Sequence, residues 1–267
     1  MAHVAILVHR HGDFNDPCNY LLREMAGVWQ DQGHRVSVLN GPAGKCEADL
    51  IINHIDLTVT PVDHLAYLRC FPKALNVAVV DISKRMISKM LVRKGEPYHG
   101  RVIVKSDLNS SGSPEASLAL KGLMPPSYCQ VLPAYHVFDG VDEVPEVIWN
   151  HRAVIVERFV PERSGEFYCL RTWVFCGDRE SNSLSFAQVP IIKQKDVVRR
   201  DVVPEVPDEL RQMRDELGFD YGKFDYGIVD GEVILYDANR TPSLGTFRRE
   251  EFMPRVRHYA EGLASFL

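Results

Sequence analysis

The sequence lacks an apolar run long enough to cross a membrane. Its longest runs, such as Val4–Val8 and Val77–Val80, stop after a few residues, whereas a spanning helix needs about 20. It also lacks a basic excess, because 31 Lys and Arg against 36 Asp and Glu give a net charge of −5, which disfavours sequence-blind binding of nucleic acid. The first residues show no basic segment followed by a long apolar one, as a secretory signal would. We therefore expect a cytoplasmic protein that binds neither membranes nor nucleic acid.

Cysteines are few, and their spacing indicates no shared role. None lies in a Cys-x-x-Cys pair or near a histidine at a zinc-binding spacing. In a chain without an export signal, such cysteines are expected to be reduced thiols. A disulfide scaffold and a zinc module are therefore unfavoured classes. The six cysteines are Cys18, Cys46, Cys70, Cys129, Cys169 and Cys176.

The first eighty residues of this 267-residue chain alternate short apolar runs with helical periods. This βαβ rhythm predicts a small parallel sheet covered by helices. The expected strands are residues 3–8, 36–39, 50–52 and 76–80. The expected helices run from Asn15-Asp16-Pro17 to Gly33, from Thr60-Pro61 to about Cys70, and from Ser83 to Arg93.

Beyond residue 100, strand-like segments dominate. They cover residues 102–105, 153–158, 167–175, 184–189, 224–229 and 232–237. One helix is expected from Pro207 to Gly218, and a last one from about Arg249. The change of pattern predicts an α/β N-terminal domain followed by an α+β domain, with the boundary near residue 80.

The sharpest chemical signal is a hairpin near the C-terminus. Two strands meet at Asp230-Gly231, a strong hairpin signal, and Asp225 and Asp237 lie among their apolar residues. With a two-residue turn, Asp225 would pair with Tyr236, and Asp237 would lie on the other face. We therefore predict a three-residue turn, Val229-Asp230-Gly231, with a G1 bulge at the glycine.

That turn would bring Asp225, Asp237 and Asn239 to one face as hard oxygen ligands. Such ligands suit Mg²⁺ that carries the phosphates of a nucleotide. The alternative for this segment alone is a pair of carboxylates at a sheet edge that face water.

Two further segments carry polar groups at strand ends. Lys105 ends the apolar strand Arg101-Val102-Ile103-Val104 and enters the loop Ser106-Asp107-Leu108-Asn109-Ser110-Ser111-Gly112. An ammonium beside hydroxyls and backbone N–H groups has the components of a phosphate site. Glu157 follows a second apolar strand, Val154-Ile155-Val156, which ends in Arg158-Phe159-Val160-Pro161.

In their order and spacing, these segments resemble the ATP-grasp superfamily of carboxylate–amine ligases. The resemblance covers Ser83 to the end of the chain, and the first domain resembles the small αβ domain that usually precedes it. It implies a domain at residues 1–82 and an ATP-grasp domain at 83–267, whose two subdomains meet at a hinge near residues 157–161.

The resemblance also implies roles for individual residues. Those implied to bind the nucleotide are Lys84, Lys105, the lid residues Ser110, Ser111 and Gly112, the hinge residues Glu157, Phe159 and Val160, Glu166 or its rival Glu162, and Lys193 or Lys195. Arg171 and Lys223 are implied to be catalytic, and Asp225, Asp237 and Asn239 are implied to bind metal.

The implied activity is ATP-dependent ligation that proceeds through an acyl phosphate. ATP and one or two Mg²⁺ ions would be the cofactors, and a small carboxylate and an amine (or a thiol) the substrates. The lid has only Gly112 where the family usually has several glycines, and Asp237 stands where Glu is more usual. The alternative is therefore a non-catalytic ATP-binding sensor with the same fold. The oligomeric state stays open, a homodimer included.

A competing motif lies at the end of the first strand. Arg10-His11-Gly12 resembles the histidine phosphatases, in which His11 would be the nucleophile and Arg10 would bind phosphate. That chemistry needs a second histidine loop, and His99-Gly100 is the only later His-Gly pair. We expect the segment His9–Asn15 to help bind the acceptor or donor substrate; the alternative is that it is merely a polar strand end.

Overall fold

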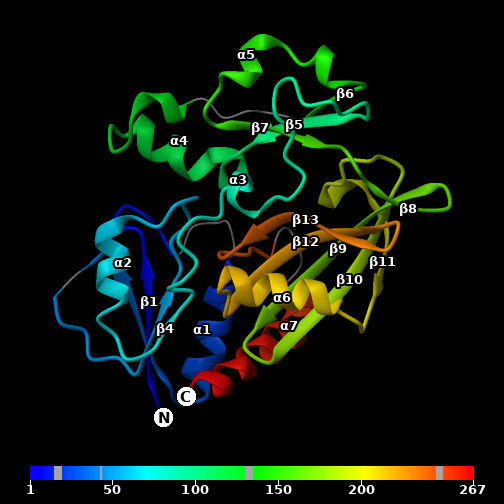
Figure 1. Cartoon of the computed structure of the whole chain (residues 1–267). Coiled ribbons are helices and arrows are strands. Elements are labelled where there is room, and N and C mark those ends of the chain that lie inside the picture. The colour runs from blue at the N-terminus through cyan, green and yellow to red at the C-terminus, as the bar shows by residue number, and fades with distance from the viewer. Residues whose placement is uncertain (15–19, 43, 130–134, 245–248) are drawn as a thin grey trace.

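The computed structural model describes residues 1–14, 20–42, 44–129, 135–244 and 249–267. Figure 1 shows three sheets: a parallel one near the N-terminus, a small antiparallel one, and a larger antiparallel one. The strands are β1 (His3–Val8), β2 (Arg35–Asn40), β3 (Leu50–Asn53), β4 (Ala74–Leu75), β5 (Val102–Ser106), β6 (His136–Phe138), β7 (Val154–Arg158), β8 (Glu162–Ser164), β9 (Phe167–Cys176), β10 (Arg179–Ala187), β11 (Val197–Val202), β12 (Tyr221–Val229) and β13 (Glu232–Asn239).

Helices separate some of these strands, but β7 to β11 follow one another without an α-helix between them. They are α1 (Leu21–Asp31), α2 (Val62–Leu68), α3 (Lys84–Ile87), α4 (Ser113–Leu120), α5 (Glu146–Trp149), α6 (Asp208–Leu217) and α7 (Arg249–Glu261). Short 3-10 turns cover Asn109–Gly112, Pro126–Cys129, Val141–Glu143, Gln194–Asp196 and Gly262–Phe266. Among the described residues, no helix combines the length and apolar character that a membrane span requires.

The N-terminal sheet is parallel, with the order β2-β1-β3-β4. Strand β1 is buried on both faces: Val4, Ile6 and Val8 face the core that contains α1, and Ala5 and Leu7 face the opposite core. The helix α1 also contacts α7, where the Trp29 indole N–H donates to the Ala260 carbonyl at 2.8 Å. The predicted parallel sheet is confirmed, and the start of the first predicted helix lies outside the described residues.

Two predicted elements in this region are wrong. Residues 76–80 form a turn after the short β4 instead of a strand. Asn76 adopts a left-handed backbone conformation with φ 55°, and its side chain donates to the Tyr221 carbonyl at 2.7 Å. The helix predicted from Ser83 to Arg93 ends at Ile87, because the following residues pair with β7: the Val92 N–H donates to the Val156 carbonyl at 2.9 Å.

The small antiparallel sheet has the order β6-β5-β7. Its valines, together with Ile148 and Trp149 of α5, form a core of their own. The larger sheet has the path β11-β10-β9-β12-β13, with β8 paired to β9. One face of this sheet packs on α6 through Trp173, Phe175 and Phe224. The predicted fold class, an α/β sheet followed by antiparallel α+β structure, is confirmed.

Candidate functional site

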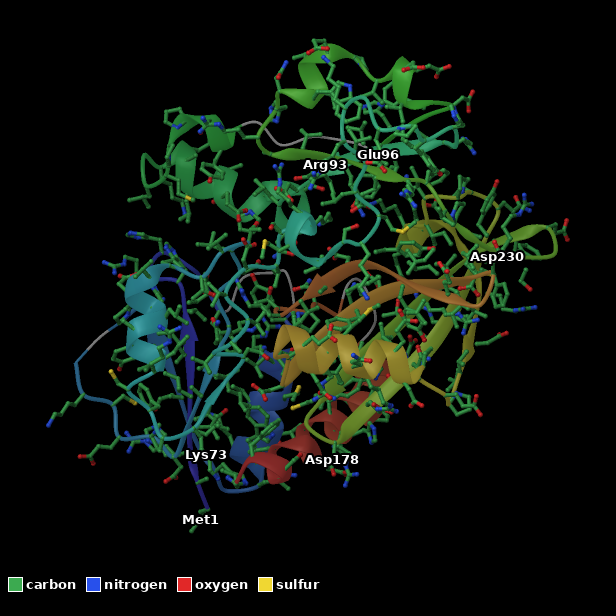
Figure 2. The ribbon with its side chains drawn as sticks, in the orientation of Figure 1. Met1, Lys73, Arg93, Glu96, Asp178 and Asp230 are labelled. Atoms are coloured by element: carbon green, nitrogen blue, oxygen red, sulfur yellow. The ribbon has the colours of Figure 1, made fainter. Side chains whose placement is uncertain are left out.

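The hairpin β12–β13 places its two aspartates directly opposite each other. Val229 pairs with Glu232, so the turn has two residues, Asp230 and Gly231, with φ of 53° and 85°; Asp230 lies at the hairpin tip (Figure 2). The predicted three-residue turn is therefore wrong. A bulge further along the hairpin shifts the register by one residue, which is the effect expected of the three-residue turn.

The bulge falls at Tyr236. Tyr226 pairs with Leu235, and Asp225 pairs with Asp237, so Tyr236 is the extra residue. A one-residue shift reverses which side chains share a face. The bulge therefore brings Asp225 and Asp237 to the same face. The same arrangement is predicted from sequence, but there it depends on a three-residue turn.

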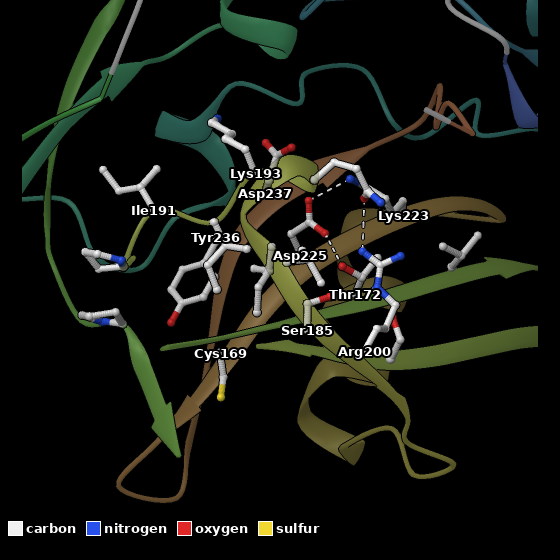
Figure 3. Close-up of a pocket in the computed structure, with 18 of the residues that line it drawn as sticks. Cys169, Thr172, Ser185, Ile191, Lys193, Arg200, Lys223, Asp225, Tyr236 and Asp237 are labelled. Atoms are coloured by element: carbon white, nitrogen blue, oxygen red, sulfur yellow. Dashed lines mark hydrogen bonds and ion pairs between the residues drawn. The ribbon is translucent and has the colours of Figure 1, made fainter. Parts of the chain in front are cut away.

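This face borders a cavity of about 570 Å³ between the two antiparallel sheets. The hinge residues 157–161 form one side, and β9, β10, β12 and β13 contribute the other. Figure 3 shows Asp225 with Thr172 and Lys223, and Asp237 beside them. The volume lies within the range that is common for ligand sites.

Each acid that borders the cavity is paired with a lysine. Lys84 lies 3.0 Å from Asp237, and Lys223 lies 2.8 Å from Asp225. Lys105 lies 2.6 Å from Glu157, and both side chains are buried. Such pairing offsets the cost of holding the carboxylates away from water.

The pKa values follow from these pairs. Burial alone would raise the pKa of Asp237, but Lys84 and then Lys223 outweigh it and hold that pKa below its usual value. Burial opposes the charge on Lys84, but Asp237 raises the pKa of that amine overall. Asp225 likewise overcomes burial to raise the pKa of Lys223. The Asp237 carboxylate is therefore held ionised, as a cation ligand must be.

Lys105 joins the two sheets. Its ammonium donates to the Tyr236 carbonyl at 3.1 Å, within the bulge of the larger sheet, while it pairs with Glu157 on the neighbouring strand β7 of its own sheet. The Tyr236 hydroxyl in turn donates to the Val160 carbonyl at 2.8 Å. The other carboxylate oxygen of Glu157, Oε1, is buried without a hydrogen-bond partner among the described residues. An orphaned buried oxygen of this kind usually meets a water, an ion or a ligand.

Eight of the residues expected from sequence line this cavity: Lys105, Glu157, Phe159, Val160, Lys193, Lys223, Asp225 and Asp237. Of the two rival lysines, Lys193 borders the cavity and Lys195 does not. Lys84 is not among the lining residues, but it contacts Asp237, which is. Asn239 lies opposite Lys223, and its Oδ1 accepts the Thr241 N–H at 2.7 Å.

Arg171 and the two rival glutamates are not among the residues that line the cavity. Arg171 makes a bidentate pair with the buried Glu162, with N–O distances of 2.9–3.1 Å. Glu162 also accepts the Ile228 N–H at 2.8 Å. Arg171 and Thr172 are neighbours on β9, so their side chains point to opposite faces of the sheet, and it is Thr172 that borders the cavity. Glu166 is exposed at the turn between β8 and β9.

The predicted lid residues form a tight turn before α4. Ser110, Ser111 and Gly112 all have positive φ, at 47°, 58° and 81°. Ser110 borders a second cavity, on the side of the N-terminal sheet. None of the three borders the first cavity.

Sequence reasoning missed the basic residues at the far end of the first cavity. Arg200 on β11 and Arg255 on α7 both border it, and the Arg200 Nε donates to the Ser185 hydroxyl at 2.9 Å. Burial, and then the charge of Arg255, lower the pKa of Arg200. The signal available in sequence was the pair Arg199-Arg200 inside the β-branched run Val197–Val203: neighbouring residues of a strand point to opposite faces, so each face receives one arginine.

The donor set suits magnesium. Among the described residues, no three His, Cys, Asp or Glu side chains gather closely enough to hold a metal by themselves. Mg²⁺ is usually bound by one or two carboxylates together with phosphates. Asp225 and Asp237 supply two carboxylates of this kind at the cavity, whereas Asn239 is not among the residues that line it.

The second cavity, of about 320 Å³, holds a buried histidine. His54 is 2% exposed, and neither ring nitrogen has a hydrogen-bond partner among the described residues. Burial, and then the charge of Arg240, lower the pKa of His54 to about 3. His54 is therefore neutral at physiological pH.

His54 should make the protein sensitive to acid. The unfolded chain takes up a proton near pH 6.5, but the folded chain does not until about pH 3. The contribution of His54 to stability is therefore complete above pH 6.5 and falls as the pH drops toward 3, by about 2 kcal/mol between pH 6.5 and 5.

Urea unfolding of wild type and His54→Phe at pH 7, 6 and 5 tests this pH dependence. The variant should show a shallower pH dependence, and His99→Phe, at an exposed position, should keep that of the wild type. Equal slopes for wild type and His54→Phe would contradict the assignment.

Comparison with known proteins shows the fold. No protein-family model and no curated protein matches the sequence, but solved structures match almost its whole length. A RimK domain ATP-grasp protein from Sphaerobacter thermophilus has a TM-score of 0.54 at 14% identity, covering 99% of both chains. The D-alanine–D-alanine ligase of Bacillus anthracis has a TM-score of 0.52 at 11% identity, covering 100% of this chain and 96% of the other.

A third match is a RiPP-associated ATP-grasp ligase from Chryseobacterium gregarium, solved with ADP and a leader and core peptide. Its TM-score is 0.56 at 9% identity, covering 99% of this chain and 97% of the other. The chain therefore has the ATP-grasp ligase fold. The histidine phosphatase alternative gains no support from these matches.

Lys105 gives the first test of nucleotide binding. Lys105→Ala should remove a charge-assisted contact to phosphate and weaken Mg²⁺–ATP affinity by about 1.5–3 kcal/mol. Calorimetry at fixed Mg²⁺ measures it, with circular dichroism to show that the variant folds. Lys195→Ala changes an exposed neighbour of the cavity and should leave the affinity unchanged. Unaltered affinity in Lys105→Ala would reject its phosphate role.

Proposed function

We propose that the protein is an ATP- and Mg²⁺-dependent ligase that joins a small carboxylate to an amine, or to a thiol, through an acyl phosphate. The observation that carries the proposal is the pair of opposed aspartates. Asp225 and Asp237 face a cavity large enough for a ligand, next to Asn239, on the fold of the ATP-grasp ligases. The Chryseobacterium ligase, which has the same fold, was solved in complex with ADP.

The hinge offers main-chain groups for the adenine. The Phe159 N–H already donates to the Arg101 carbonyl at 2.9 Å, and the Val160 carbonyl accepts the Tyr236 hydroxyl. We therefore propose the Phe159 carbonyl and the Val160 N–H as the contacts with the base. Lys105 and Lys193 would then contact the phosphates, because their ammonium groups lie along the same cavity.

Asp225, Asp237 and Asn239 would hold one or two Mg²⁺ ions, which supply positive charge to the transferring phosphoryl group. Lys84 and then Lys223 outweigh burial and hold the pKa of Asp237 below its usual value, and Lys223 also pairs with Asp225. Lys223 itself borders the cavity. Its ammonium would stabilise the negative charge that passes from the substrate carboxylate to the phosphoryl oxygens. Arg171 has a different role in this proposal: its pair with Glu162 braces β8 and β9 against β12.

The proposed substrates are small molecules. Among the matching structures, the Chryseobacterium ligase was solved with a leader and core peptide, and the ligase PsnB with a minimal precursor. A peptide carboxylate therefore belongs in any substrate panel.

A non-catalytic ATP sensor is the second candidate. The observation that favours it is that lysines already pair with all three acids of the cavity. Such pairs hold the site together without metal. A sensor would bind Mg²⁺–ATP but would not turn it over.

Release of ADP separates the two candidates. Purified protein with Mg²⁺–ATP is supplied with amino acids, small carboxylates and a peptide, each with and without an amine acceptor. A ligase releases ADP only when both a carboxylate and an acceptor are present. Nucleotide binding without ADP release from any combination supports the sensor. Failure to bind Mg²⁺–ATP would overturn both candidates.

A further inference from the structure

The first cavity extends across the larger sheet, well past the two aspartates. In the sheet order β11-β10-β9-β12-β13, the contact of Tyr236 with the hinge lies at β13, and the opposite margin of the cavity is β11. Asp225 is paired with Thr172, and Thr172 with Ser183 of β10. Because opposed residues share a face, these side chains form a polar row that leads from the candidate metal ligands toward β11. Figure 3 shows Arg200 and Tyr236 on opposite sides of Asp225.

Arg200 lies on the cavity face of β11, at the end of this row. It pairs with Ser185 of β10, and both side chains border the cavity. The guanidinium donates to the Ser185 hydroxyl at 2.9 Å and to the amide oxygen of Gln194 at 3.2 Å. These two acceptors are uncharged, so they orient the guanidinium without neutralising it. The neighbouring Arg199 points to the opposite face of the sheet, where its guanidinium lies 3.9 Å from the centroid of the Phe186 ring.

The helix α7 brings a second arginine to the same end of the cavity. Phe252, Arg255 and Tyr259 share one face of this helix because they are three and four residues apart, and all three border the cavity. Tyr259 is 2% exposed, and its hydroxyl contacts the Ser181 hydroxyl of β10, which holds this face of α7 against the sheet. Arg255 lies 5.6 Å from the centroid of the Phe252 ring and has no salt bridge within the described part of the chain.

The two guanidinium groups act on each other through their charges. Burial, and then the charge of Arg255, lower the pKa of Arg200, while Asp225 acts in the opposite direction and more weakly. Like charges held within electrostatic range cost free energy, which a bound anion would offset. A guanidinium also presents its N–H donors in a planar fork that matches a carboxylate or a phosphate. This end of the cavity therefore suits an oxyanion.

The arginines lie on a different strand from the candidate metal ligands. Three strand spacings of about 4.8 Å separate β12 from β11, which makes about 14 Å between their backbones. The carboxylate that is phosphorylated must lie next to the transferring phosphoryl group, at Asp225 and Asp237. An anion held at Arg200 and Arg255 is therefore a second group of the substrate and not the reacting one.

We propose that Arg200 and Arg255 bind a second anionic group of the carboxylate substrate, so that the acid this protein activates carries two negative charges; this rests on the proposed function. The second group is a carboxylate or a phosphate, and the hydroxyls of Thr172 and Ser183 line the path between it and the reacting carboxylate. Both arginine side chains are exposed. The subsite is therefore open to solvent, and a substrate can enter it.

The test compares diacids with analogues that lack only the second charge. The probes are the dicarboxylates from succinate to adipate, each beside its monoamide, and 3-phosphonopropionate beside propionate. They are titrated by calorimetry into wild-type protein saturated with Mg²⁺–ADP, and again without nucleotide. We expect at least one diacid to bind at a concentration at least about tenfold below that of its uncharged analogue, the scale of a charge-assisted hydrogen bond.

The probes also distinguish the two sources of the anion. Tighter binding of 3-phosphonopropionate than of succinate would support the subsite with phosphate as its preferred group, and the reverse order would support it with carboxylate. If no dicarboxylate binds better than its monoamide, and 3-phosphonopropionate binds no better than propionate, the proposal is overturned.

Variants assign the preference to the two arginines. Arg200→Met and Arg255→Met should each reduce the preference for the diacid at least about tenfold, and circular dichroism shows that they fold. Arg255→Lys keeps the charge without the planar fork and should retain part of the preference. Arg199→Met, on the opposite face of β11, should bind as wild type does. An unchanged preference in the folded Arg200 and Arg255 variants would reject the subsite.

Binding of the nucleotide is the competing explanation for these arginines. Calorimetry with Mg²⁺–ATP and Mg²⁺–ADP tests it in Arg200→Met and Arg255→Met. We expect the ratio of the two affinities to stay that of the wild type. If both variants weaken ATP binding much more than ADP binding, the arginines hold the γ-phosphate, and the proposal is overturned.

The two proposals fail separately. Release of ADP with monocarboxylates, without any preference for diacids, would keep the ligase and reject the subsite. Conversely, a protein that prefers diacids through Arg200 and Arg255 but never binds Mg²⁺–ATP would contradict the ligase and retain the subsite as an anion-binding site.

Discussion

Substitution of Asp237 by asparagine should lower substrate-dependent ADP formation at least about a hundredfold, which is the scale of losing one electrostatic stabiliser. The change keeps the size of the side chain and one oxygen but removes its negative charge. Charge on the transferring phosphoryl group is stabilised mainly in the transition state. ATP affinity should therefore fall much less, because Lys105 and the hinge still face the cavity.

The measurement is ADP production by wild type and Asp237→Asn with a productive substrate pair, beside calorimetry for ATP. Lys84 loses its partner in this variant, so Asp237→Asn with Lys84→Met is the matched control. If the unpaired lysine caused the defect, the double variant would recover activity. Turnover of Asp237→Asn at the wild-type rate would contradict its metal-binding role.

The fold could be predicted from sequence where local pattern and tertiary structure agree. His3–Val8 is apolar throughout and forms a strand buried on both faces. The segment after Ser83 shows the limit: its amphipathic pattern predicts a helix, but Leu91 bridges to Glu157 and Val92 pairs with β7. Backbone pairing with a distant strand overrides local helical preference.

The site could be predicted in residue type and order, but not in its register. The need to align Asp225 with Asp237 follows from sequence, whereas the position of the bulge does not. Tyr236 bulges where its carbonyl meets Lys105 and its hydroxyl meets Val160, and both partners are distant in the chain. Arg171 shows the same limit, because one step along β9 separates it from the face that borders the cavity.

The second cavity was beyond sequence reasoning for another reason. His54 directly follows the strand Leu50–Asn53, and a single histidine there predicts only a polar strand end. Its burial depends on Phe14, Tyr20 and α4, which come from three other parts of the chain. A buried histidine without partners becomes visible only when these segments come together.

Arg240 is expected to be one of the largest single contributors to stability. It is fully buried, and its guanidinium donates to five backbone carbonyls. Nε donates to Ile55 at 3.0 Å, and the two NH₂ groups donate to Leu57, Thr58, Val79 and Val80. Burial lowers the pKa of Arg240 to about 10, so it stays charged at neutral pH. It thereby ties the end of β13, one residue after Asn239, to two loops of the N-terminal sheet.

Arg240→Met should therefore lower the free energy of unfolding by about 3–5 kcal/mol, because several buried carbonyls lose the donor that the guanidinium supplies. Arg240→Lys should recover part of this loss: its ammonium keeps the charge but cannot reach both loops as the planar guanidinium does. Urea unfolding at pH 7 measures the free energy of unfolding of both variants. Arg199→Met, at an exposed arginine, is the control and should change it by less than about 0.5 kcal/mol. A loss below about 1 kcal/mol in Arg240→Met would mean that the loops hold their positions without the arginine, and the end of β13 would then need another anchor.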